Sequence, residues 1–373
     1  MPKIGFCYVS TRDTGVAPPN SWPLFRAWQK RAGFQIMKVH LPTWATTDPL
    51  DVKEAVWDGV SEVIVRTGDV PDGYDQQAVR ARLDAVNGSG LRWRDVLAEA
   101  AARGVTVWLE VGNEPDHGGW SAERARDATI ALVQALRPVY PWAKWLASLP
   151  TRSSFLASFL SPALLSTVDG IATHLYGGSW PGDAAGGDWG PIFDTLMSRA
   201  DVTTVYVTEI GIEARDMDKE EKALRLFEWA SRAPRKVKGI LVFTPGAVGK
   251  WPQWDGYVFP EEKHFLILSG LRGKVMPRDP SWPVSPVTGK AVYPPFQQYW
   301  SQNGGLYQFG YPVTDPCQEV IRGCQCRADG SRHVVQYFER AVFEQHSGIM
   351  PSTGGILLRR LGAESAEQRG YLP

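Results

Sequence analysis

The sequence predicts a (β/α)₈ barrel followed by a small second domain. The chain of 373 residues is too long for one ordinary domain, but it matches a barrel of about 250 residues with an added module. Over residues 1–270, eight short apolar runs alternate with stretches of helical spacing, and beyond residue 270 the composition becomes rich in proline. Alternating strands and helices favour a parallel sheet, and eight repeats favour its closure into a barrel.

The expected strands are short runs rich in β-branched and aliphatic residues, which suit a buried sheet. They lie at residues 4–9, 34–41, 62–66, 105–111, 144–149, 168–174, 204–209 and 239–243. Segments with helical spacing separate most of them, at residues 22–32, 95–102, 121–136, 155–165, 191–199 and 219–231. Gly104, Ser121 and Pro138 stand where residues of their types commonly end, cap or stop a helix.

The balance of charge argues against nucleic acid and anionic membranes as partners. Lys plus Arg and Asp plus Glu are both 40, which gives a formal net charge of +0 and no basic field. No run of 18 or more apolar residues is present, so we expect no membrane span. The 16 Trp residues are more than one core needs, and exposed aromatic faces are typical of sites that bind sugar rings. We therefore expect an uncharged partner.

Neither the cysteines nor the histidines form a recognisable metal motif. Cys7 stands alone in the first strand, while Cys317, Cys324 and Cys326 allow one bridge with an odd thiol, free thiols, or a metal site short of one ligand. None of the six histidines pairs at i, i+4 spacing with an intervening Glu, and there is no phosphate-binding G-x-x-x-x-G-K-[ST] loop. We expect no metal and no cofactor.

Polar residues follow the predicted strands at the end where a barrel carries its active site. Residues 105–111 lead into Asn113 and Glu114; Pro115 then ends the pairing and restricts Glu114 to extended backbone. Glu209 ends the seventh strand. The remaining candidates are His40, Arg66, His174 and Tyr176 at strand ends, Trp180 after the sixth strand, and Trp251 and Trp254 after the eighth.

Glu114 and Glu209 form a pair that suits hydrolysis of glycosidic bonds. One carboxyl must be protonated to help the leaving oxygen depart, and the other must be ionised to attack. Two like charges at one site raise the pKa of one of them, which supplies this difference. Asn113 could bond a sugar hydroxyl, while Tyr176 and Arg66 could orient the nucleophile.

Three motifs in register resemble the clan A glycoside hydrolases. They are Gly112-Asn113-Glu114-Pro115-Asp116 at the fourth strand, His174-Leu175-Tyr176 after the sixth, and Thr208-Glu209-Ile210-Gly211 at the seventh. The resemblance covers roughly residues 1–260 and implies a retaining double displacement, with Glu114 as acid/base and Glu209 as nucleophile. For a retaining enzyme we expect about 5–5.5 Å between the two carboxyl groups. It also implies that Asn113 binds the 2-hydroxyl of the glycone, that Tyr176 lies near the nucleophile and that His174 lines the pocket. Similarity to the β-1,3-glucanase and cellulase-like branches favours a β-glucan as substrate.

Two positions depart from that family. Many members carry an Arg on the second strand, where this chain has Lys38 and His40, and we interpret Arg66 on the third strand as the substitute. Many also carry a Trp at the end of the eighth strand, where this chain has residues 243–245, Phe-Thr-Pro. Trp251 or Trp254 would then have to enter from the loop, and the subfamily stays open.

Each candidate also has a purely structural interpretation. Asn-Glu-Pro could begin a helix with Pro115 as its first residue, and Glu209 could favour a helix N-terminus. His174 could be a core histidine, Tyr176 a packing residue, and Arg66 an ion-pair partner of a neighbouring strand end. At the level of function, the alternatives are a catalytically silent carbohydrate-binding barrel and a cell-wall-lytic enzyme acting on bacterial wall glycan.

The expected domains are a catalytic barrel at residues 1–270, a Pro-rich linker at 271–295 and an accessory module at 296–373. In the module, Asn303-Gly304-Gly305-Leu306 and Phe309-Gly310-Tyr311-Pro312 resemble the small LGFP-type repeats of secreted bacterial wall-associated proteins. The resemblance implies attachment to a cell-wall glycan and an extracellular or wall-directed location; a structural buttress is the alternative. The N-terminal residues lack the apolar core of a signal peptide, so the chain as written is expected to be soluble and mature.

Overall fold

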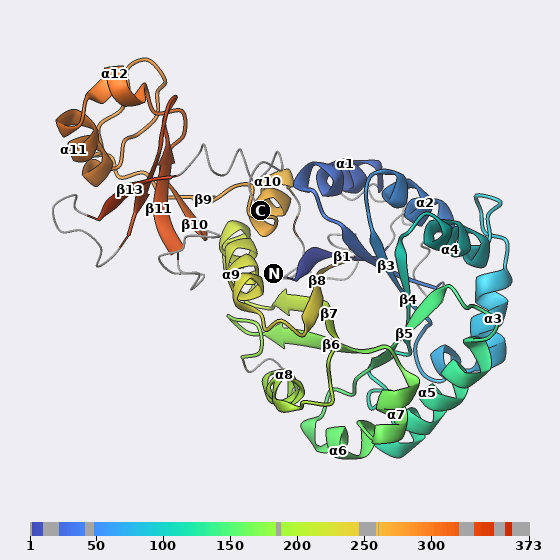
Figure 1. Ribbon diagram of the computed structural model, residues 1–373. Helices are drawn as coiled ribbons and strands as arrows, with labels where there is room; N and C mark the ends of the chain where they lie inside the picture. The colour runs from blue at the N-terminus through green and yellow to red at the C-terminus, as the bar shows by residue number, and fades with distance from the viewer. Residues whose placement is uncertain are drawn as a thin grey trace. The chain divides into compact units, whose positions relative to one another are not determined.

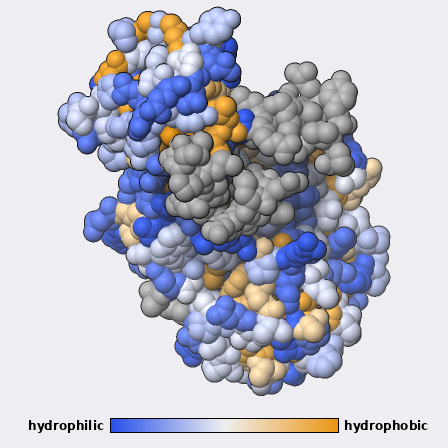
Figure 2. Space-filling model, turned by 60° about the vertical axis from the view of Figure 1, so that its left-hand side comes forward, coloured by the Kyte–Doolittle hydropathy of each residue, from blue (hydrophilic) through white to orange (hydrophobic). Residues whose placement is uncertain are grey.

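The computed structural model describes residues 2–9, 22–41, 48–183, 188–245, 259, 261–320, 332–346 and 355–359. The chain divides into two compact units, Met1–Ser269 and Gly270–Pro373. Within the described residues, no helix is both long enough and apolar enough to cross a membrane. Figure 2 shows mostly hydrophilic residues over the described surface of one face, with hydrophobic residues in small separate groups.

The first unit is a closed barrel of eight parallel strands in sequence order, with β1 paired to β8. This arrangement confirms the predicted (β/α)₈ fold, and Figure 1 shows the helices outside the ring of strands. The strands are β1 (Lys3–Val9), β2 (Ile36–His40), β3 (Glu62–Arg66), β4 (Thr106–Val111), β5 (Ala143–Ser148), β6 (Gly170–Gly177), β7 (Val205–Ile212) and β8 (Val237–Pro245).

The helices of this unit are α1 (Trp22–Ala32), α2 (Pro49–Trp57), α3 (Gln76–Asp84), α4 (Trp93–Ala102), α5 (Ala122–Leu136), α6 (Leu156–Phe159), α7 (Pro162–Thr167), α8 (Trp189–Ser198), α9 (Lys219–Arg232) and α10 (Glu262–Leu268). Two end signals act as predicted, because the Ser121 side chain accepts a hydrogen bond from the Arg124 N–H and Gly104 takes a positive φ of 86° after α4. The single helix predicted at 155–165 is wrong. Pro162 at the first turn of α7, capped by Ser161, starts a new helix.

The barrel interior is apolar through its middle and polar at both ends. Alternate strand residues, including Ile36, Ile64, Trp108 and Leu241, meet in one buried cluster. At the N-terminal end of β3, the carboxylate of Glu62 accepts hydrogen bonds from the Trp108 indole at 2.7 Å and from the hydroxyl of Tyr206. The packed middle separates this lower carboxylate from the polar upper end.

The second unit is built on a five-stranded antiparallel sheet in the order β13-β12-β11-β10-β9. Phe296, Phe309, Phe338 and Phe343 form most of its core. Residues 271–295, predicted as a linker, fall within this unit, where they supply β9. Its elements are β9 (Lys274–Val275), α11 (Pro294–Gln302), α12 (Gly305–Phe309), β10 (Cys317–Val320), β11 (Arg332–Tyr337), β12 (Val342–Gln345) and β13 (Ile356–Leu358).

Candidate active site

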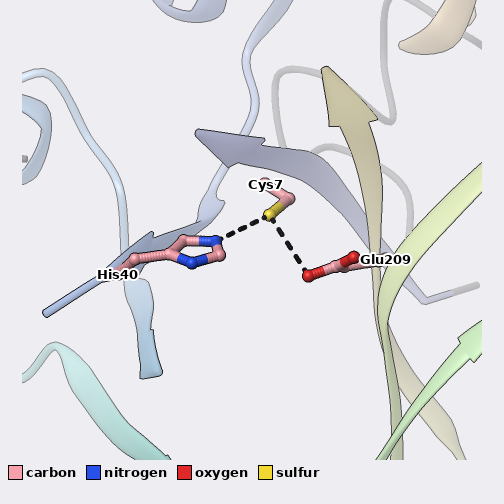
Figure 3. A group of neighbouring side chains, drawn as sticks. All are labelled: Cys7, His40 and Glu209. Atoms are coloured by element: carbon pink, nitrogen blue, oxygen red, sulfur yellow. Dashed lines mark hydrogen bonds between the residues drawn. The ribbon is translucent and has the colours of Figure 1, made fainter. Parts of the chain in front are cut away.

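The C-terminal ends of the barrel strands bring six of the sequence candidates and Cys7 into one cluster, made of two hydrogen-bonded groups that meet where His174 Nε2 lies 3.6 Å from Glu209 Oε1. Arg66 ends β3 and donates to Glu209 on β7, while the ring of His174 on β6 reaches Glu114 after β4. The remaining contacts run from Tyr176 to Glu209 and from His40 to Cys7, and Figure 3 shows Cys7 between His40 and Glu209.

An irregularity in β7 points two successive side chains into the barrel. The register of β7 with β8 shifts between Val207 and Ile210, and its register with β6 shifts at Thr173 and His174. A bulge of this kind breaks the strict alternation of a strand. Thr208 therefore donates to Glu110 at 2.9 Å inside the barrel, while the next residue, Glu209, also faces inward.

Glu209 is a buried carboxylate held in one orientation. Its Oε1 accepts from Lys38 Nζ at 3.1 Å and from Arg66 Nη1 at 3.3 Å. Its Oε2 accepts from the Tyr176 hydroxyl at 2.7 Å. Burial alone would raise the pKa of this carboxyl, but His174 and the nearby charges of Lys38 and Arg66 lower it well below its ordinary value. Glu209 is therefore ionised at neutral pH.

A second buried carboxylate lies beneath Glu209. Glu110 is fully buried on β4 and receives Lys38 Nζ at 2.8 Å, so that this one ammonium group bridges two carboxylates. Burial favours neutral Lys38, but the pKa of Lys38 is raised because Glu110 and Glu209 stabilise its charge. The two anions thus fix the position of Lys38, and Lys38 fixes Glu209 in turn.

Glu114 sits on a strained turn. Its φ is +36°, which corrects the expectation that Pro115 would hold it in extended backbone. Strain of this kind persists only where the surroundings fix the residue. Here both carboxylate oxygens of Glu114 are bonded, and its carbonyl accepts from the His117 N–H at 2.9 Å. The turn holds the carboxylate of Glu114 in a defined place.

Gly112 shapes this turn through its close contact with the ring of Tyr74. It has a φ of +70°, its N–H donates to Thr67 Oγ1 at 2.9 Å, and a Cβ added to it would collide with the buried ring of Tyr74. Glycine is therefore required on two counts, the positive φ and the lack of space.

Gly112→Ala is expected to destabilise the protein by about 2–5 kcal/mol, because a left-handed backbone cost is added to overpacking against Tyr74. Gly119→Ala is the matched control, since Gly119 has a φ of +74° with nothing within 4 Å of an added Cβ. The control should cost only about 1–2 kcal/mol. Urea unfolding of both variants measures the difference, and equal losses would contradict this description of the turn.

Two imidazoles clamp Glu114. Its Oε1 lies 2.5 Å from His174 Nδ1, and its Oε2 lies 2.8 Å from His117 Nδ1. Burial would raise the pKa of this carboxyl, but His174 and His117 lower it to about 2. This corrects the expectation that the repulsion of two like charges would raise the pKa of one of the carboxyls, since the pKa of Glu209 is lowered as well. The other nitrogen of His174, Nε2, lies 3.6 Å from Glu209 Oε1. A single imidazole ring thus stands between the two carboxylates.

The other candidates lie in different settings. Asn113 Oδ1 is buried and has no hydrogen-bond partner within the described part of the chain. The indole of Trp180 lies under the guanidinium of Arg225, 4.8 Å away, just beyond β6. Trp251 and Trp254 fall outside the described residues. Of the predicted aromatic residues, neither tryptophan after β8 can therefore be placed.

Sequence reasoning missed several residues of the cluster. Lys38 and Glu110 each stand in the middle of an apolar strand, and a charge in that position must be paired; this signal could have found them. Trp189, two residues before the helix expected at 191–199, begins α8 and packs on the rings of His174 and Tyr176 at 5.9 and 5.8 Å. His117 carried no signal, because only the turn places it against Glu114.

Cys7, His40 and Glu209 offer the only donor set suited to a metal among the described residues, with ligand atoms within 4.8 Å of one another. The set fits a cation poorly. Glu209 Oε1 already accepts from Lys38 and Arg66, whose charges would repel a metal ion. Burial and the charge of Glu209 raise the pKa of the Cys7 thiol, whereas metal ligation requires the thiolate.

No protein-family model matches the chain, and no curated protein matches it. Solved structures do match. A GH5 cellulase from an Icelandic hot spring isolate matches at 15% identity and a TM-score of 0.46, over 75% of this chain and 90% of its own. The endo-β-1,4-mannanase from Thermotoga petrophila matches at 12% identity and a TM-score of 0.46, over 72% and 77%. A GH128 exo-β-1,3-glucanase from Aureobasidium namibiae matches at 13% and 0.43, over 70% and 89%. Likenesses at this level assign no activity to this chain, so a function has to follow from the site.

Proposed function

We propose that the chain is a retaining glycoside hydrolase that cleaves β-glycosidic bonds of an oligo- or polysaccharide, with a β-glucan as the favoured substrate. The observation that carries this proposal is the pair of carboxylates in unlike settings on either side of the His174 ring. Glu209 is held ionised by cations, while Glu114 is bonded to His117, whose side chain is 62% exposed. One carboxylate is suited to attack, and the other to exchange protons with solvent.

In the first step, an oxygen of Glu209 attacks the anomeric carbon while the bond to the leaving oxygen breaks and Glu114 delivers a proton to that oxygen. In the second step, water attacks the same carbon, Glu114 takes its proton, and the bond to Glu209 breaks. The hydrogen bonds from Lys38, Arg66 and Tyr176 orient the Glu209 carboxylate for attack. Free Glu209 is regenerated at the end of the cycle.

Substrate recognition is proposed for residues around this pair. The amide oxygen of Asn113, which lacks a partner among the described groups, is suited to accept from the 2-hydroxyl of the sugar. Trp180, Trp251 and Trp254 are proposed as aromatic platforms for sugar rings. His40 is proposed to line the buried side of the substrate site as a neutral group. Burial and the charges of Arg66 and Lys38 hold its pKa well below the ordinary value and keep it neutral.

Glu114→Gln tests the acid role directly. For a glucan whose leaving group needs a proton, kcat should fall by about 10²–10⁴-fold. For a 2,4-dinitrophenyl β-glycoside, whose leaving group departs without a proton, the first step should proceed at nearly the original rate. Pre-steady-state release of dinitrophenol measures that step, and an equal loss on both substrates would contradict the assignment.

The second unit is proposed to attach the enzyme to a cell-wall glycan. The alternative function consistent with such attachment is hydrolysis of the wall glycan itself. The unit's short helix α12, which glycines cap at both ends, exposes Tyr307 almost completely, at 92%. Reducing-sugar release from β-1,3- and β-1,4-glucans, set against clearing of bacterial wall suspensions, separates a glucanase from a wall-lytic enzyme. Binding to a glycan without any product release would instead favour the catalytically silent barrel.

A further inference from the structure

We propose that His117 stores the proton that Glu114 delivers to the leaving group, and that it takes a proton back when Glu114 deprotonates the attacking water. This inference rests on the proposed hydrolase function and adds a residue to it. His117 lies outside the three family-like motifs and acts through Glu114, not on the sugar. Its role is therefore to hold and position the proton, without contacting the sugar.

The need for such a store follows from the setting of Glu114. An acid must carry a proton when the substrate arrives, yet two imidazoles lower the pKa of Glu114 to about 2. At neutral pH the carboxyl is therefore ionised, and the proton has to reside on a neighbour. His117 Nδ1 is 2.8 Å from Glu114 Oε2, a distance over which a proton can pass directly.

His117 is better placed for this task than His174. The side chain of His174 is only 2% exposed, and its two nitrogens face the carboxylates of Glu114, Glu209 and Glu110, so it is shielded from solvent. The side chain of His117 is 62% exposed and can exchange protons with solvent after each turnover. Its Nε2 lies 3.3 Å from Thr151 Oγ1, which orients the ring.

The charges around His117 favour its imidazolium form. Its hydrogen bond to Glu114 raises its pKa and outweighs burial; Asp116 on the same loop also raises it, and Arg152 after β5 lowers it. Glu114 itself is faced by His117 from the loop, His174 from β6 and Glu209 from β7. His117 is thus protonated below its raised pKa and loses the proton as pH rises through it.

Protons are conserved over one catalytic cycle. In the first step the imidazolium of His117 passes its proton to Glu114 as Glu114 protonates the leaving oxygen, the bond from the anomeric carbon to that oxygen breaks, and the bond to Glu209 forms. In the second step water supplies the oxygen that replaces Glu209, and its proton moves through Glu114 to His117. One water is consumed, and every residue returns to its starting state.

Side-chain NMR titration of the histidines tests where the resting proton lies, without any substrate. In the wild-type protein, His117 should stay protonated to a higher pH than an ordinary histidine, and in Glu114→Gln its pKa should fall back towards the ordinary value. Arg152→Gln should move the pKa of His117 the other way, upwards by a few tenths of a pH unit, because an exposed charge is partly screened. An ordinary pKa that is identical in wild type and Glu114→Gln would overturn the proposal.

Kinetics of His117→Gln test whether the stored proton is used. Gln keeps a hydrogen-bond donor near Glu114 but cannot take up or release a proton. The alkaline limb of the kcat/KM profile should therefore move to lower pH, and the rate of glucan cleavage at pH 7 should fall about tenfold or more. Dinitrophenol release from the activated glycoside should change less than about twofold. An unchanged pH profile, or equal losses on both substrates, would overturn the inference. Failure of the wild-type protein to cleave any glycan would instead overturn the proposed function.

Discussion

Glu209→Ala is expected to lower kcat/KM on glycans by about 10⁴-fold or more, while the protein stays folded. Glu209 has the setting that a carboxylate nucleophile requires, since it is buried, ionised and fixed by Lys38, Arg66 and Tyr176. No other described carboxylate combines these contacts with a place at the open end of the barrel, because Glu110 lies beneath it with no exposed surface. Initial rates on a soluble glucan, with circular dichroism as the folding check, measure the effect.

Glu213→Ala is the matched control for this variant. Glu213 is an exposed carboxylate that follows the last residue of the same strand, so its removal should leave the rate within about twofold. Added azide should restore turnover to Glu209→Ala, because the cavity left by the side chain admits a small nucleophile, and the product should be the α-glycosyl azide. A Glu209→Ala protein with wild-type activity would remove the glycosidase role altogether.

Lys38→Met should be the most damaging single change to stability at the site, at about 3–5 kcal/mol. Lys38 and Glu110 are a fully buried pair 2.8 Å apart, and removing the ammonium leaves the carboxylate of Glu110 buried without its counter-charge. The free energy of unfolding in urea measures this cost. The activity should fall as well, because Lys38 also bonds to Glu209.

Two further variants distinguish a buried-charge effect from a general loss of packing. Glu110→Gln in the Lys38→Met background should show a coupling energy of about 1–3 kcal/mol, because the unpaired charge is no longer present. Lys53→Met removes an ion pair of similar length, 2.9 Å to Glu99, from a partly exposed position and should cost at most about 1 kcal/mol. Additive losses in the double variant would contradict a buried pair.

The sequence predicted the barrel well because its strands are short apolar runs between clear stop signals. The helices were harder. α3 was missed because its buried face consists of only two residues, Val79 and Leu83, which is too short a stripe to show in the sequence. Asp75 nevertheless caps it by accepting from the Ala78 N–H. α2 was also missed, although Asp48 and Asp51 form a capping box around Pro49, a strong local start signal. A pattern of apolar residues predicts helices with a large buried face. Helices with a mostly polar surface have to be predicted from their capping residues instead.

The residues of the site likewise fall into those that the sequence could predict and those that it could not. Glu114, Glu209, His174 and Tyr176 could be found because each ends a predicted strand, and a barrel gathers strand ends. The bulge that turns Thr208 and Glu209 inward together depends on the pairing of three strands, and no local pattern encodes it. His117 is brought to Glu114 by a turn with positive φ at Gly112 and Glu114, which the rule for residues before proline did not predict.

The anomeric form of the first product shows whether Glu209 forms a bond to the sugar. Proton NMR during the first minutes of cleavage of a β-linked glucan oligosaccharide resolves the two anomers before they interconvert. A double displacement through Glu209 predicts that the β-anomer appears first and the α-anomer only later, by mutarotation. Initial release of the α-anomer would rule out a double displacement, because Glu209 would then be activating water instead of forming a bond to the sugar.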